Sequence, residues 1–376
     1  MKTVVELLSD LIRIPSHSVI SNRPIADYAT AVLRACGWST REFSYKDPAG
    51  IEKVNLLAAP PGQNAGDPNV DMVFMCHTDT VPYAADWPNA VDPILKDGNL
   101  HGCGACDVKG YLACLLAILS QDPAQKWPAG LRLVLTAEEE IGCIGAAHLF
   151  AVNALRPRRM VIGEPTQLHP ARAGKGYCLA EVTVHGKEAH SAHPRQGVSA
   201  IYHAARLIAA IEELAREKTT QTHPFFDPGF TTINVGTIAG GTAKNIVPGR
   251  CVFQLEWRPI PGEPADRVLE SVAQIIERMR REDGTFYAEI QPLRQQPGFE
   301  TSAEAALVRR VESLTGRPAT SIPFGSEASI FAPAAEEVIV FGPGDMRTAH
   351  SSREYVPLAE LDAAVACLGS LMRGTS

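Results

Sequence analysis

Apolar residues recur in short runs of strand length over roughly the first 170 residues, separated by segments of helical length. Strands and helices alternate in this way in α/β domains with a mostly parallel sheet. The apolar run within Lys109–Ser120 predicts a buried helix, and Ile25–Cys36 predicts another that ends at Gly37. We expect strands at Val54–Ala58, Val70–Met75, Leu131–Thr136 and Met160–Gly163.

The pattern changes at about Gly174: Leu179–Val184 alternates as a strand does, and Val198–Arg216 has apolar residues at helical spacing. The order expected from there on is β-α-β-β-α-β, which is that of a ferredoxin-like unit. Its elements are a strand at Leu179–Val184, a helix at Val198–Arg216, strands at Thr231–Ile238 and Cys251–Trp257, a helix at Ala265–Arg280 and a strand at Thr285–Ile290.

Helix and strand alternate again after Pro297, in the segments Ala303–Leu314, Glu337–Phe341 and Leu358–Met372. The simplest arrangement is one domain inserted into another. We therefore predict an α/β domain with a mostly parallel mixed sheet, built from residues 1–173 and 294–376. The inserted α+β domain is predicted to span residues 174–293.

Composition and charge exclude several classes of function. The 376 residues carry a formal net charge of −7, from 35 basic and 42 acidic side chains, and lack the basic clusters that nucleic acid binding requires. No apolar run approaches the roughly 18 residues of a membrane span, and the acidic N-terminal segment is unlike a signal peptide. Nine scattered cysteines indicate reduced thiols, so we expect a cytoplasmic protein without a membrane partner.

His77 and Asp79 end the apolar run that begins at Val73. Residues two positions apart in a strand point to the same face. A carboxylate next to a neutral imidazole orients a metal-binding histidine. The alternative is an ordinary polar pair at a strand end, and the other strands decide between the two.

Acidic residues or a histidine follow three more predicted strands. Leu131–Thr136 runs into Glu138, Glu139 and Glu140, which suit either a solvated loop or a site that combines a metal ligand with a base. Glu164 follows the next strand directly, and His350 follows Glu337–Phe341 after a loop.

Asp107 lies in the glycine-rich segment Gly102–Gly110 ahead of a helix, where its role is metal ligation or a plain N-cap. This segment lacks the spacing of a phosphate-binding loop. Its Cys103 and Cys106 have no second cysteine pair, which argues against a structural zinc site. Because sites of open α/β sheets lie at the carboxyl ends of strands, these histidines and carboxylates predict a centre for two metal ions sharing a bridging carboxylate.

With these motifs in place, the chain resembles the di-zinc metallopeptidase family that includes acetylornithine deacetylase, succinyl-diaminopimelate desuccinylase, aminoacylase and the glutamate carboxypeptidases. The resemblance spans nearly the whole chain. It implies a zinc-peptidase-like catalytic domain with an inserted lid and dimerisation domain. The stretches that carry it include Ser21–Tyr28, Gly163–Thr166, Arg172–Gly176, Ala189–Pro194 and Ala349–Tyr355.

The resemblance implies a role for each residue of the predicted centre. His77 and Glu164 are expected to bind one ion, Glu140 and His350 the other, with Asp107 as the bridge. Asp79 is expected to orient His77, and Glu139 to act as the general base. Glu138 falls where relatives have an acidic residue without a catalytic role. The implied cofactors are two divalent ions, zinc or cobalt.

The resemblance also implies roles for residues of the inserted domain. His190 matches a histidine that steadies the oxyanion in the site of a partner subunit, which implies a homodimer. Asn245 and Arg258 match residues that grip the substrate carboxylate. The family's bridging motif usually reads Gly-Arg-Gly-Thr/Ser-x-Asp-x-Lys-Gly, whereas this chain has Cys103, Ala105 and Cys106 within it.

The implied reaction is removal of the acetyl group from N2-acetyl-L-ornithine, a step of arginine biosynthesis. Glu327 is either the partner of the cationic ornithine side chain or a surface carboxylate. The alternatives for the whole chain are a deacylase acting on another N-acyl amino acid, such as a desuccinylase or an aminoacylase, and a metal-binding relative without catalysis.

Overall fold

The computed structural model describes residues 2–84, 87, 89–122 and 125–374, which form two compact units. The first unit comprises residues 1–172, 300–320 and 326–376, and the second comprises residues 173–299 and 321–325. The chain re-enters the first unit at Glu300, later than expected, because strand β14 (Tyr287–Gln296) runs well past Ile290.

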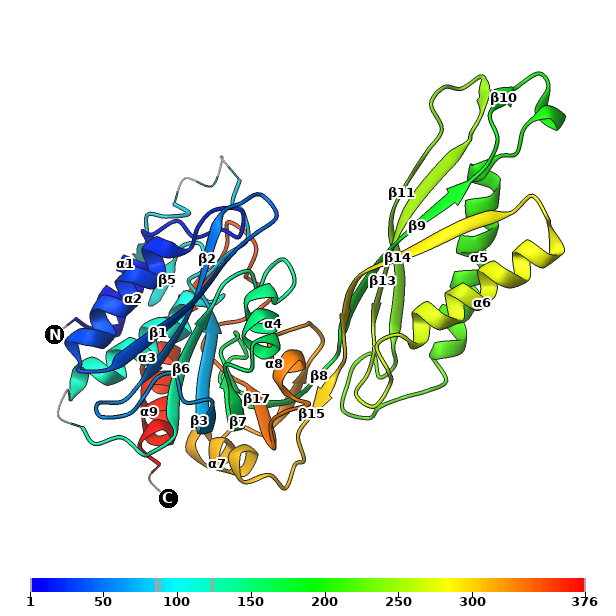
Figure 1. The fold of residues 1–376 in the computed structure, drawn as a ribbon. Helices are drawn as coiled ribbons and strands as arrows, with labels where there is room; N and C mark the ends of the chain where they lie inside the picture. Colours follow the sequence, from blue (N-terminus) through cyan, green and yellow to red (C-terminus); the bar gives the residue numbers. More distant parts are fainter. Residues whose placement is uncertain (1, 85–86, 88, 123–124, 375–376) are drawn as a thin grey trace. The chain divides into compact units, whose positions relative to one another are not determined.

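A nine-stranded mixed sheet forms the centre of the first unit, which confirms the predicted α/β class (Figure 1). Its order is β1-β2-β6-β3-β7-β17-β8-β15, with β16 paired to β8. The four central strands β6, β3, β7 and β17 are parallel, and the outer pairs β1–β2, β2–β6 and β17–β8 are antiparallel. The bounds are β1 Ser39–Lys46, β2 Glu52–Ala59, β3 Asn69–His77, β6 Leu131–Thr136, β7 Arg156–Ile162, β8 Ala171–Gly174, β15 Phe299–Glu300, β16 Thr320–Ile322 and β17 Glu337–Val340.

Helices cover this sheet and close its apolar core. Figure 1 shows α1, α2, α3 and α9 on one side of the sheet and α4 and α8 on the other. The predicted buried helix is α3, whose residues from Lys109 to Leu119 are all buried. The bounds are α1 Val4–Ile12, α2 Arg23–Ala35, α3 Lys109–Gln121, α4 Ile144–Ala151, α7 Ala306–Thr315, α8 Ala328–Phe331 and α9 Leu358–Arg373.

Several elements of the first unit are absent from the sequence prediction. Strand β1 reads Ser-Thr-Arg-Glu-Phe-Ser-Tyr-Lys and lies at the edge of the sheet, where half-exposed polar positions give no apolar run. Helix α4 is short and follows directly on the glutamate turn. A separate three-stranded sheet has the order β18-β5-β4, with bounds β4 Ile94–Lys96, β5 Asn99–His101 and β18 Tyr355–Pro357.

The second unit has a four-stranded antiparallel sheet of order β11-β13-β9-β14, with α5 and α6 on one face (Figure 1). Alternate residues of β9 are buried beneath the helices, as the alternation at Leu179–Val184 predicted. The β-α-β-β-α-β order is the one expected from the sequence. The bounds are β9 Tyr177–His185, β10 Ala189–His190, a 3-10 turn at Pro194–Gln196, α5 Ala200–Lys218, β11 Thr232–Gly240, β12 Ile246–Val247, β13 Arg250–Arg258 and α6 Arg267–Glu282.

Among the described residues, no helix combines the length and apolar character that crossing a membrane demands.

Candidate metal centre

His77 is the last residue of β3 and is almost fully buried. Its Nδ1 lies 2.9 Å from the main-chain carbonyl oxygen of Asp79, and its Nε2 lies 3.1 Å from Oδ1 of Asp107. A carbonyl can only accept, so Nδ1 carries the proton and donates it to Asp79. Without a metal ion, Nε2 donates its own hydrogen bond to Asp107, and loss of that proton makes the Nε2 lone pair available to a metal ion.

The carboxylate of Asp79 serves the glutamate turn rather than the imidazole ring. Its Oδ1 lies 3.7 Å from His77 Nδ1, beyond hydrogen-bond distance. It accepts hydrogen bonds from the main-chain N–H groups of Glu139 at 3.1 Å and Glu140 at 3.3 Å, and from the Ser18 hydroxyl at 2.7 Å. Asp79 therefore orients His77 through its backbone and fixes the position of both glutamates through its side chain.

Glu138 is excluded from the centre by a buried ion pair of its own. Its carboxylate lies 3.4 Å from Lys53 Nζ and accepts a hydrogen bond from the Tyr45 hydroxyl at 2.8 Å. Lys53 is 1% exposed, on strand β2. Glu138 also has a positive φ of 59°. The solvated-loop alternative is therefore wrong, because all three carboxylates are buried or nearly so.

Two clusters of metal-ligating side chains lie at the carboxyl end of the parallel strands. His77, Glu139 and Glu164 form the first cluster, and in each cluster the three ligating atoms lie within 4.8 Å of one another. The second cluster contains Asp107, Glu140 and His350. Strands β3, β6 and β7 are adjacent and parallel, so the residues that follow them meet at one edge.

Asp107 connects the two clusters. Its Oδ1 lies 3.1 Å from His77 Nε2, and its Oδ2 lies 2.9 Å from Nε2 of His350. His350 also lies 3.1 Å from a carboxylate oxygen of Glu140. One carboxylate with a histidine at each oxygen is the geometry expected of a ligand between two cations. The N-cap alternative for Asp107 is wrong, because helix α3 is capped by Val108 without a side-chain hydrogen bond.

Glu354 holds the loop that carries Asp107, a role that sequence reasoning missed. One of its carboxylate oxygens accepts the N–H groups of Cys106 at 3.1 Å and Asp107 at 3.2 Å. Glu354 is buried and lies four residues after His350 in the sequence. The short spacing from His350 was the one sequence feature that could have pointed to Glu354. Its contact with the Asp107 loop, which is distant in sequence, is visible only in the fold.

Burial and crowding of negative charge raise the proton affinity of the glutamates. Burial, followed by repulsion from Asp107, raises the pKa of Glu140 to about 8 and that of Glu164 well above its ordinary value. Burial also raises the pKa of Glu139. Burial alone would raise the pKa of Asp107 too, but hydrogen bonds from His350 and His77 lower it.

This charge distribution fits divalent cations. Oε1 of Glu140 is buried and has no hydrogen-bond partner among the described residues. Several buried carboxylates this close together are stable when cations or protons neutralise their charge. Imidazole and carboxylate ligands in two adjacent groups suit zinc-like ions.

The two cysteines in the bridging loop are not part of either cluster. Cys103 and Cys106 are buried free thiols, and no candidate metal group among the described residues contains a cysteine. The Cys106 thiol lies 3.6 Å from Glu354 Oε1 and 3.8 Å from the Thr348 hydroxyl, so it packs between the loop segments that carry Asp107 and His350.

Glu327 lies in the first unit and is completely buried, so the surface-carboxylate alternative is wrong. Burial raises its pKa to about 8. Its two carboxylate oxygens have no hydrogen-bond partner of ordinary geometry among the described residues, although the Thr136 hydroxyl approaches them. Glu327 is in neither metal cluster.

The second unit brings His190 and Asn245 together. His190 pairs with Ile246 between β10 and β12, and the N–H of Ser191 donates to the carbonyl oxygen of Asn245 at 3.0 Å. Both predicted side chains are exposed. Within this unit they are separated from Arg258, which lies at the far end of β13, a strand about 26 Å long. The Arg258 guanidinium binds Glu256 at 2.7 Å and stacks over a tyrosine ring.

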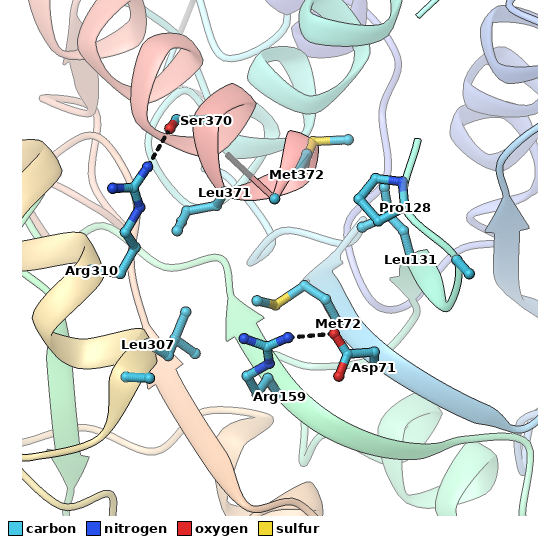
Figure 2. Close-up of a pocket in the computed structure, with 13 residues that line it drawn as sticks. Asp71, Met72, Pro128, Leu131, Arg159, Leu307, Arg310, Ser370, Leu371 and Met372 are labelled. Carbon is cyan, nitrogen blue, oxygen red and sulfur yellow. Dashed lines mark hydrogen bonds and ion pairs between the residues drawn. The ribbon is translucent and has the colours of Figure 1, made fainter. Parts of the chain in front are cut away.

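A cavity of about 280 Å³ lies at the amino ends of the first unit's central strands, whereas the candidate metal centre lies at their carboxyl ends (Figure 2). Met72 near the start of β3 and Leu131 at the start of β6 line it, whereas His77 ends β3. Figure 2 shows the guanidinium groups of Arg159 and Arg310 at its walls, bonded to Asp71 and Ser370. It contains none of the predicted site residues.

The α/β sheet with two histidine–carboxylate clusters at its carboxyl edge defines a hydrolase of the two-metal type. Comparison with known proteins specifies the family. Residues 73–374 match the family described as "Peptidase family M20/M25/M40", and the chain belongs to that family.

The similarity to known relatives extends over nearly the full length of the chain. The chain is 43% identical over 374 residues to an acetylornithine deacetylase of Myxococcus xanthus, an alignment that covers 98% of this chain and 96% of that protein. Its fold is similar to that of a tripeptidase from Staphylococcus aureus, with a TM-score of 0.78, 23% identity and coverage of 98% and 97%. It is also similar to a dinuclear metal-binding peptidase of the M20 family from Bacillus subtilis, with a TM-score of 0.65, 14% identity and coverage of 98% and 96%.

Proposed function

We propose that this protein is a two-metal amide hydrolase that converts N2-acetyl-L-ornithine to ornithine and acetate. The observation that carries the proposal is that Asp107 joins the two clusters. One oxygen of its carboxylate contacts His77 and the other contacts His350. The choice of substrate is supported by the full-length similarity to an acetylornithine deacetylase.

We assign His77 and Glu164 to one ion and Glu140 and His350 to the other, with Asp107 between them. Glu139 belongs by position to the first cluster as well. We assign it as the base because Glu140 and His350 are already in contact, whereas Glu139 is bonded to none of the predicted ligands. Zinc and cobalt both accept this mixed ligand set.

The protein's own residues account for the proton transfers. When bound, divalent ions lower the pKa of a water molecule and polarise the amide carbonyl. The Glu139 carboxylate accepts the proton of the attacking water and then delivers it to the leaving amine nitrogen. The imidazole of His190 is assigned to the negative charge that develops on the carbonyl oxygen.

Substrate recognition is assigned to three residues outside the clusters. Asn245 and Arg258 are proposed to bind the α-carboxylate, and Glu327 the cationic side chain of ornithine. Because Asn245 and Arg258 lie at opposite ends of one unit's sheet, the proposal requires that Asn245 and His190 act in the site of a second copy.

We accordingly propose a homodimer formed through the second unit. Strand β11 is the edge of its sheet and exposes Ile238, and Tyr202 of α5 is 75% exposed. An exposed apolar edge strand is a ready template for pairing with another chain. Sedimentation should show a dimer that Ile238→Lys weakens. A fully active monomer would contradict the role given to His190. The nine cysteines, none of which forms a disulfide in the described part of the chain, support a reducing compartment such as the cytoplasm.

The decisive test compares three substrates on the metal-loaded enzyme. N2-acetyl-L-ornithine should give a higher kcat/KM than N-succinyl-diaminopimelate or N-acetylmethionine. A preference for the succinyl compound or for N-acetylmethionine would replace the assignment by another deacylase of the family. If the protein binds metal but hydrolyses none of the three, the non-catalytic alternative is favoured.

A further inference from the structure

The turn after Glu139 places the thiol of Cys143 in contact with the Glu139 carboxylate. Cys143 is fully buried, and its Sγ donates a hydrogen bond to Oε1 of Glu139 at 3.1 Å. The residue is four positions after Glu139 and directly precedes helix α4. None of the roles assigned above uses it.

The backbone at Cys143 has a conformation that a cysteine rarely adopts. Its φ of 54° and ψ of 36° lie in the left-handed region, which favours glycine or asparagine. Gly142 precedes it and provides a glycine where φ is 142°. A non-glycine residue held in such a conformation requires compensation from its surroundings, and such residues are concentrated at functional sites.

Main-chain hydrogen bonds close this turn without help from the thiol. The N–H groups of Gly142 and Cys143 both donate to the carbonyl oxygen of Glu139 at 2.9 Å, and the N–H of Ile144 donates to Glu138 at 3.0 Å. Asn55 holds the same turn by accepting from the N–H of Ala137 at 3.1 Å. The thiol can therefore be changed while the bonds that form the turn remain.

We propose that Cys143 is a positioning residue for the general base, whose S–H group fixes the carboxylate of Glu139 in its productive orientation. The inference rests on the proposed function, which assigns Glu139 as the base. With Oε1 bonded to the thiol, rotation of the carboxylate about its last bond is restricted. The second oxygen is then the one presented to the attacking water.

The choice of a thiol has a chemical reason. A thiol is a weaker donor than a hydroxyl or an amide, so it orients the carboxylate while reducing its basicity less. A cationic or strongly donating neighbour would hold Glu139 more firmly, but at the cost of its ability to accept a proton.

Three substitutions separate positioning from packing. Cys143→Gly suits the left-handed backbone and removes the donor, Cys143→Ala removes the donor alone, and Cys143→Ser keeps a donor. We expect kcat to fall roughly 3–10-fold in the glycine and alanine variants, the range of one hydrogen bond, with KM and bound metal unchanged. Serine should restore kcat to within about threefold of the wild type. Cys114→Ser, in buried helix α3, is the matched control and should leave kcat unchanged.

The contact itself has a readout that does not depend on turnover. The infrared S–H stretching band of Cys143, obtained as the difference between wild type and Cys143→Gly, should shift when Glu139→Gln replaces the charged acceptor. Full kcat in Cys143→Gly, or a band that Glu139→Gln does not move, would overturn the positioning role. Any N-acyl amino acid that is hydrolysed serves for the kinetic comparison, so a wrong substrate assignment does not affect it. A wild type inactive on all of them overturns the proposed function and this role with it.

Discussion

Glu139 and Glu140 are neighbours in sequence with different surroundings, and the difference defines a test. Glu140 contacts His350, whereas the Glu139 carboxylate accepts a hydrogen bond from the Cys143 thiol and lies in the cluster of His77 and Glu164. We expect Glu139→Gln to lower kcat by roughly 10²–10⁴-fold, the usual contribution of a general base, and to leave two bound ions per chain. Glu140→Gln should instead reduce the metal content, as measured by elemental analysis of dialysed protein. Loss of metal from Glu139→Gln would make Glu139 a ligand and overturn its assignment as the base.

Single residues also show where sequence reasoning ends. The five predicted ligands each follow a strand or a glycine turn, so pattern alone could assemble them as candidates. No periodic pattern marks three other residues, Lys53, Cys143 and Glu354. Lys53 and Glu354 contact residues distant in sequence, and Cys143 contacts Glu139 through a tight turn. Lys53 stands directly before the predicted strand Val54–Ala58, a place where a lysine is usually exposed.

At the scale of elements, four adjacent parallel strands explain why the ligands meet. The carboxyl-terminal parts of strands β6, β3, β7 and β17 are mostly apolar and buried, so the sequence marks them clearly. Edge strand β1 and the short strands β4, β5 and β18 have no such pattern, because few of their side chains enter the core. The part of the fold that positions the candidate site was thus the most predictable part.

Lys53 joins strand β2 to the glutamate turn, and its loss should destabilise the fold. Its Nζ lies 3.4 Å from Glu138 and 3.5 Å from Asp47, and it also bonds the carbonyl oxygen of Ile20. Lys53→Met leaves Glu138 buried without its cation, which typically costs about 3–5 kcal/mol. Urea unfolding should report this loss. The double variant Lys53→Met/Glu138→Gln should recover part of the stability, and an unchanged midpoint in the single variant would contradict the buried pair.

Glu354 connects the segment of His350 to the loop of Asp107, and it should control metal affinity. Glu354→Ala removes the acceptor for two main-chain N–H groups, so Asp107 loses its fixed position. Loss of such a supporting contact typically lowers metal affinity about 10–100-fold. Glu354→Gln retains a carbonyl acceptor and should lose less. Titration calorimetry of metal into the apoprotein gives both affinities, and equal affinity in wild type and Glu354→Ala would exclude the connection.

At the scale of the whole molecule, the buried carboxylates couple stability to both pH and metal. A carboxyl group whose pKa is raised on folding stabilises the protein below its ordinary pKa, and this stabilisation is lost as the pH rises through the folded value. Burial raises the pKa of Glu140 and of Glu327 from 4.5 to about 8. Hydrogen bonds to Asp107 and Glu140 raise the pKa of His350 to about 10, which acts in the same direction.

The metal-free protein should therefore lose thermal stability between about pH 6 and about pH 9. Asp107, whose pKa is lowered, has its effect in acid and does not oppose this trend. Metal ions neutralise the ionised carboxylates, so the rise in Tm on adding metal should be larger at about pH 9 than at about pH 6. Scanning calorimetry with chelator and with added zinc measures both quantities. Glu327→Gln removes one buried acid outside the clusters, so the Tm measured in chelator should fall less steeply with pH in this variant. A Tm that does not change with pH in chelator would show that these carboxylates are neutralised without metal, and the argument for cations at this edge of the sheet would fail.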